Sequence, residues 1–164
     1  MRIKQMISAG LFSVFLLSAQ FSFAQLKGVV TDDANVLTPA TETTLLQQLQ
    51  KEEKESGNKI YVYTVKVYNQ KDIDNLLAGA AKTVVASKSG KKSGAILLVV
   101  SPESRKIKII ASEGLEDRLN NEMCTQLIKS EIVPPVKKGD YDTGVKAGVA
   151  ALQKALKGAY VSRD

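Results

Sequence analysis

The sequence predicts an α/β protein, a three-layer α/β/α sandwich built on a small mixed sheet. The sequence contains, in this order, a segment with the residue alternation of a strand, a segment with the apolar spacing of a helix and an unbroken apolar segment. This is the order of a βαβ unit with two parallel strands. A second alternating segment follows the apolar one after a short turn, which indicates an antiparallel hairpin. Further amphipathic helices are expected before and after this core. The sheet should therefore have helices on both of its faces.

The first helix is expected over residues 39–56. Thr38 is a suitable N-cap, and Pro39 fits the first helical position because its missing N–H is not needed there. Gly57 ends the helix because glycine readily adopts the left-handed conformation of a helix terminus. The preceding segment, 31–38, contains two aspartates and an asparagine and is interpreted as an entry loop.

Three strands and a helix follow in the pattern of the sequence. Residues 59–67 alternate as a strand, and residues 72–87 carry apolar side chains at helical spacing. Residues 95–100 are all apolar and indicate a buried strand, whereas residues 106–112 alternate with lysines, as is typical of an edge strand. Two more helices complete the prediction, over residues 120–130 and 142–156.

The hairpin places two loops together. The second parallel strand should begin where its antiparallel partner ends, so the loop 90–94 should lie beside the segment 113–117. The first loop contains glycines and lysines, and the second contains carboxylates. Such convergent loops on a rigid sheet are common positions of functional sites.

The first 24 residues have the pattern of a secretory signal peptide. Arg2 and Lys4 precede an apolar stretch over residues 11–17, and Ser22 and Ala24 provide the small residues of a cleavage site. An uncleaved N-terminal anchor is the alternative. The expected product is a single domain over residues 25–164, periplasmic or secreted, with no membrane span after cleavage.

Composition excludes several kinds of chemistry. The chain has no histidine and one cysteine, so it cannot form a Ser-His-Asp triad, a Cys-His pair, an HExxH zinc site or an internal disulfide. Cys124 shares a helical face with Leu127 and is expected to be a small buried apolar residue rather than a nucleophile. Without the leader the net charge falls from +6 to +4, and we expect no nucleic-acid partner because no aromatic-basic surface is evident.

Carboxylates in expected loops and at helix starts are the candidates for a functional site. Hard divalent cations bind carboxylate and carbonyl oxygens, which separate loops can supply if they converge. The alternative for each single residue is helix capping or solvation. The six candidate metal ligands are Asp32, Asp33, Glu116, Asp117, Asp140 and Asp142.

Four ordered segments resemble the TPM domain family. The segment 30–37 is similar to the opening D-x-A-x-x-L signature of the family, and Gly94, the strand after it and Arg105 are similar to its middle block. Gly114-Leu115-Glu116 resembles the end of the G-x-G-L-E motif, although Ser112 replaces the first glycine. The segment 138–144 resembles the closing block.

The resemblance implies an exported or lumenal α/β/α domain and suggests that Asp32, Glu116 and Asp140 meet in one site. Some relatives are described as acid phosphatases, others bind divalent cations, and some modulate a membrane receptor. We expect a monomeric module that binds Ca²⁺, or alternatively Mg²⁺, and that assists another cell-envelope protein. The alternative is a metal-dependent acid phosphatase acting on phosphomonoesters, with Arg105 or Lys91 as a further clamp on the phosphate.

Overall fold

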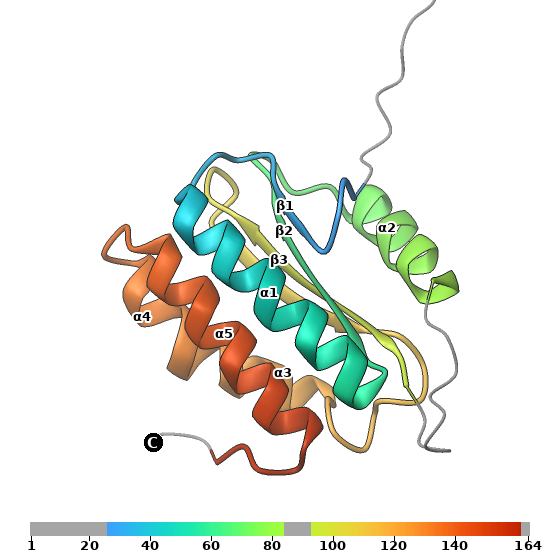
Figure 1. Ribbon diagram of the computed structural model, residues 1–164. Coiled ribbons are helices and arrows are strands. Elements are labelled where there is room, and N and C mark those ends of the chain that lie inside the picture. The colour runs from blue at the N-terminus through green and yellow to red at the C-terminus, as the bar shows by residue number, and fades with distance from the viewer. Residues whose placement is uncertain (1–25, 84–92, 162–164) are drawn as a thin grey trace, which may run out of the picture.

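The sheet has four strands in the order β1-β2-β3-β4 (Figure 1). The computed structural model describes residues 26–83 and 93–161. The first three strands are parallel and the fourth is antiparallel, as the βαβ unit and the hairpin predict. Their bounds are β1 Val30–Asp32, β2 Lys59–Thr64, β3 Ala95–Ser101 and β4 Lys106–Ala111.

Strand register defines two opposite edges of the sheet. At one edge Asp32 of β1 pairs with Thr64 of β2, which pairs with Val100 of β3. We call this the carboxyl edge because β1, β2 and β3 all end there. At the other edge, the amino edge, the beginning of β3 pairs with the end of β4 through Ile96 and Ala111.

Helices cover both faces of the sheet, so the α/β/α sandwich is confirmed (Figure 1). One face packs against a group of helices that forms the larger core, and on the other face α2 (Gln70–Lys82) is the one helix among the described residues. The helices of the larger core are α1 Pro39–Ser56, α3 Asn121–Leu127, a π-helix Ile128–Ile132, α4 Val133–Val136 and α5 Tyr141–Leu156.

Most predicted elements are confirmed, and the capping of α1 is among them. The Thr38 side chain accepts a hydrogen bond from the Thr41 amide, and Gly57 adopts a left-handed φ of 74°. Two strand predictions need correction. Residues 30–32 form β1 rather than an entry loop, and β2 ends at Thr64, so that Val67 is 62% exposed.

The predicted helix 120–130 is interrupted by the π-helix. Pro134 and Pro135 follow it directly and lack the N–H groups that a regular helix would need at those positions. The Val133 amide instead donates to the Ile128 carbonyl, five residues earlier. This wider turn lies against α5 at Gly148, where an added Cβ would stand 2.6 Å from Ile132 Cδ1 and 2.8 Å from its Cγ1.

The N-terminal predictions fall outside the structure. The expected leader, residues 1–24, lies outside the described residues, as do the end of the helix predicted over 72–87 and most of the loop 90–94. Among the residues that are described, no helix is long and apolar enough to cross a membrane.

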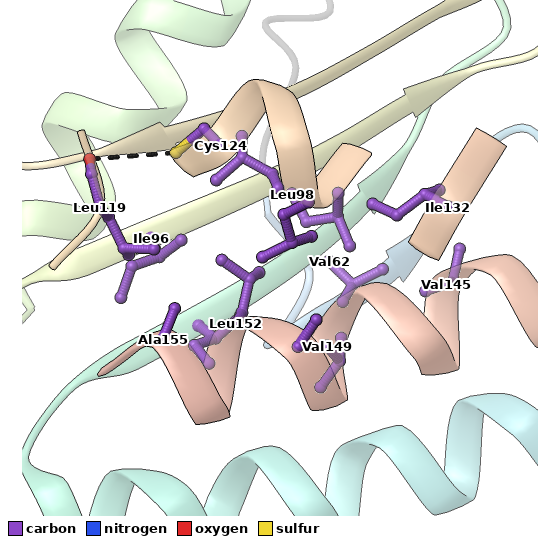
Figure 2. Close-up of a cluster of buried hydrophobic side chains, with 14 of the residues drawn as sticks. Val62, Ile96, Leu98, Leu119, Cys124, Ile132, Val145, Val149, Leu152 and Ala155 are labelled. Carbon is purple, nitrogen blue, oxygen red and sulfur yellow. Dashed lines mark hydrogen bonds between the residues drawn. The ribbon is translucent and has the colours of Figure 1, made fainter. Parts of the chain in front are cut away.

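Cys124 belongs to the larger core, the cluster of buried side chains that also contains Leu98 and Leu152 (Figure 2). Its side chain is 8% exposed, and its Sγ lies 3.9 Å from the carbonyl oxygen of Leu119. Burial raises the pKa of the thiol, which keeps it in the protonated and unreactive form at neutral pH. The expected structural role of this residue therefore has a physical basis.

The Cys124→Ala variant should lose about 1 kcal/mol of folding free energy, because removal of one buried sulfur leaves a small void. Urea unfolding of the variant and the wild type measures this difference. Calcium response, measured in the same samples, should be unchanged. Loss of that response in a folded variant would contradict a purely structural role for the thiol.

Candidate functional site

Asp32 organises the loop between β1 and α1. Its carboxylate accepts hydrogen bonds from the amides of Val36, at 3.2 Å, and Leu37, at 2.9 Å, and from the Thr64 hydroxyl of β2. Asn35 lies inside this loop with a left-handed φ of 56°, a conformation that asparagine tolerates well. The loop thus folds around one carboxylate at the carboxyl edge.

Asp33 points toward the other face of the sheet. It forms an exposed ion pair with Lys27, with 2.9 Å between Nζ and Oδ1, and lies 3.5 Å from the Tyr63 hydroxyl, which donates to it. Burial, together with the Asp33 charge and its hydrogen bond, raises the pKa of Tyr63, so the phenol remains a donor. The two consecutive aspartates, one at the end of β1 and the other at the start of the following turn, therefore have different partners.

Asp142 connects the first turn of α5 to the beginning of α1. Its carboxylate accepts a hydrogen bond from the Thr38 amide at 2.9 Å and from the Thr38 hydroxyl at 2.7 Å. Leu37, whose amide binds Asp32, is the preceding residue. Two carboxylates 110 positions apart in the sequence are thus held by adjacent amides of one loop.

Asp140 is the N-cap of α5 and accepts a hydrogen bond from the Thr143 amide at 2.9 Å. This bond lowers the pKa of Asp140. Partial burial by itself would raise the pKa of Asp142, but the hydrogen bonds from Thr38 and Thr41 and the charge of Lys146 outweigh it and lower the pKa. Both carboxylates therefore stay ionised at and somewhat below their ordinary value of 3.8.

Glu116 and Asp117 lie at the amino edge, away from this group. They follow β4, whose last residue pairs with Ile96 near the beginning of β3, whereas Asp32 lies level with Val100. Four residues along β3 separate the two levels by about 13 Å. The meeting of Asp32, Glu116 and Asp140 that the family resemblance suggested does not occur, because the parallel β1 ends at the carboxyl edge whereas the antiparallel β4 ends at the amino edge.

The neighbourhood predicted at the amino edge is present where the structure describes it. An added Cβ at Gly94 would lie 2.6 Å from the Ser112 Oγ and 2.8 Å from Leu115 Cδ1. Glu116 accepts the Gly114 amide at 2.8 Å and 3.0 Å through its two oxygens, so its carboxylate closes its own turn. Asp117 is exposed.

The sequence predicted one site that included Glu116, and it gave little indication of the side chains that bind the acidic candidates. Thr38, Thr64 and Tyr63 bind these carboxylates, and only the capping pattern at Thr38 gave any signal in the sequence. Within residues 26–83 and 93–161, no three acidic or cysteine side chains stand in an arrangement that could hold a metal ion.

A family model, that of the TPM domain, matches residues 30–155. The chain belongs to the TPM domain family. Among curated proteins the comparison found no significant match.

Solved structures similar to this TPM domain are bacterial. The N-terminal domain of a protein from P. gingivalis has a TM-score of 0.65 at 23% identity, covering 83% of this chain and 86% of that one. The BA42 protein from the psychrophilic Bizionia argentinensis has a TM-score of 0.56 at 17% identity, covering 78% and 86%. The N-terminal domain of the cg2496 protein from Corynebacterium glutamicum has a TM-score of 0.54 at 12% identity, covering 84% and 83%. At these identities the likeness establishes the fold.

Proposed function

We propose that this TPM domain binds a divalent cation at the carboxyl edge, preferably Ca²⁺, and acts as a binding module for another cell-envelope protein. One observation supports the site. The Asp142 carboxylate accepts a hydrogen bond from the Thr38 amide, and the Asp32 carboxylate accepts one from the adjacent Leu37 amide. Two carboxylates that bind adjacent amides of one loop would supply part of the oxygen-rich shell that Ca²⁺ requires.

The donor chemistry fits a hard cation. Asp140 and Asp142 remain ionised over the whole neutral and mildly acidic range because their pKa values are lowered. Ca²⁺ takes six to eight oxygens, so backbone carbonyls of the loop and water would have to complete its shell. The hydrogen bonds that these carboxylates now accept use only some of their lone pairs, which leaves acceptor capacity for a cation.

A metal-dependent acid phosphatase is the second candidate. The observation that favours it is the position of Arg105, which lies in the turn between β3 and β4 and hence at the carboxyl edge with Asp32 and Asp142. A guanidinium near a bound cation is a suitable partner for a phosphoryl group. In this reading the carboxylates hold the metal and Arg105 holds the substrate.

Calcium titration should raise the thermal unfolding temperature of the wild type. Binding to the folded state alone stabilises it by about 2.7 kcal/mol at a hundredfold excess over Kd. Asp142→Asn and Asp140→Asn should reduce this gain, since each removes one negative charge from the carboxyl edge. The response should also fade as the pH falls through the lowered pKa values of these groups, because protonated carboxylates do not ligate Ca²⁺.

Glu116→Gln is the matched control because it removes the same charge at the amino edge. It should respond to calcium as the wild type does, and amide shifts in NMR should centre on residues 32–38 and 140–142. Equal responses from all three variants, or none at millimolar calcium, would contradict the proposal. Hydrolysis of a generic phosphomonoester that stops on addition of a chelator would favour the phosphatase.

A further inference from the structure

A cavity of about 500 Å³ opens between the β3–β4 turn and α4, at the carboxyl edge. Much of its lining is apolar, supplied by Val100, Ile107, Val133 and Val136. Val100 is 1% exposed, so the cavity reaches the larger core, while the other three are half-buried. An apolar body that entered it would be removed from water, which is favourable in proportion to the area buried.

Cationic side chains complete the lining. Arg105, Lys106 and Lys137 are all exposed, and no acidic residue lies among the described residues of the cavity. Lys106 is engaged elsewhere, with its Nζ 4.3 Å from the ring centroid of Tyr68. Within the described part of the chain, Arg105 and Lys137 form no ion pair, so two cations remain available beside an apolar cavity.

Arg105 adopts a backbone conformation that disfavours arginine. Its φ is 49°, and its amide donates to the Pro102 carbonyl at 3.1 Å to close the hairpin turn. Glycine or asparagine is the usual residue at such a position because a Cβ is strained there. Residues in such conformations cluster at ligand-binding and active sites, so the backbone of Arg105 motivates a search for a ligand beside it.

We propose that this cavity binds a small carboxylate that has an apolar body, such as a medium-chain acyl carboxylate. The two carboxylate oxygens of the ligand would accept hydrogen bonds from the planar guanidinium of Arg105. Lys137 would add a second positive charge. The ligand's chain would occupy the valine- and isoleucine-lined space. Tyr141, which stands between Asp140 and Asp142, also lines the cavity, so the cavity adjoins the proposed cation site. The acyl-carboxylate proposal does not depend on a bound cation.

The test is titration of the metal-free protein with octanoate in the presence of a chelator, followed by NMR and calorimetry. The wild type should bind octanoate saturably, with shifts at the cavity residues. Butyrate should bind more weakly because it fills less of the apolar space. Octanol should bind at least tenfold more weakly because it lacks the charge.

Arg105→Gly is the decisive variant, since it removes the guanidinium and also relieves the backbone strain. Octanoate affinity should fall at least tenfold, while the unfolding temperature stays the same or rises. Arg105→Asn, which also tolerates this conformation, provides a second test if the glycine variant folds poorly. Lys137→Gln should weaken binding several-fold, and Lys71→Gln, on α2 across the sheet, should have no effect.

Three results would overturn the proposal. The first is undiminished octanoate binding by Arg105→Gly and Arg105→Asn. The second is equal binding of octanol and octanoate, which would show that the charge is irrelevant. The third is displacement of octanoate by inorganic phosphate at similar concentration, which would identify a general anion site. A chelator is present throughout, so failure of the cation proposal would leave these outcomes unaffected.

Discussion

Replacing Asp32 by alanine should lower the free energy of unfolding by about 3 kcal/mol. Three donors, the Val36 and Leu37 amides and the Thr64 hydroxyl, would lose their charged acceptor in a partly buried loop. A buried donor without an acceptor has lost its hydrogen bonds to water and gains none in return. The loss of stability should therefore exceed that of a typical substitution at the surface. Urea unfolding at neutral pH measures it.

Asp33→Ala is the matched control for this substitution. The two aspartates are neighbours and carry the same charge, but the ion pair of Asp33 with Lys27 is exposed. Exposed pairs contribute about 0–1 kcal/mol, so the control should be close to the wild type in stability. Equal losses from both variants would mean that charge at this end of the sheet, rather than the hydrogen bonds of Asp32, supports the loop.

Gly148→Val should destabilise the domain by about 3 kcal/mol through overpacking. The added side chain would begin 2.6 Å from Ile132 Cδ1, and Leu98 Cδ2 stands 3.5 Å away. Ile132 is completely buried and cannot move away without displacing its neighbours. Thermal and urea unfolding should both show the loss.

Gly79→Ala is the control, and its effect should have the opposite sign. Gly79 is also helical, but an added Cβ there meets nothing within 4 Å. Alanine should therefore stabilise the domain by about 0.5–1 kcal/mol through helix propensity and reduced freedom of the unfolded chain. If Gly148→Val unfolded at the same urea concentration as the wild type, the contact between the π-helix and α5 would not be tight.

The regular elements could be predicted because their patterns are local. The apolar run of β3 and the helical spacing of α2 each depend on a few consecutive residues. β1 was missed because three residues containing an aspartate carry no alternation, and it becomes a strand only by pairing with β2. The π-helix was missed because its cause, the missing N–H groups of Pro134 and Pro135, lies beyond the segment 120–130 whose apolar spacing predicted a regular helix.

Only part of the candidate site could be predicted from the sequence, and the reason differs from that for β1 and the π-helix. Hairpin geometry correctly placed Gly94 beside the segment 113–117, where it lies against Leu115, since the two strands that lead to these positions are adjacent in sequence. The edge that Asp32 occupies follows from the pairing of β1 with β2, and the approach of Asp142 to the same loop depends on the packing of α5 against α1. The Asp142 contact with Thr38 results from that packing and has no signature in either segment.

The contact between Asp142 and Thr38 joins residues 104 positions apart. Closing so long a loop costs chain entropy that only the packed core can offset. The contact of Asp142 with Thr38 therefore exists only when α5 has docked, and no fragment that ends before α5 contains it. A cation bound between these two segments would consequently indicate that the entire domain is folded.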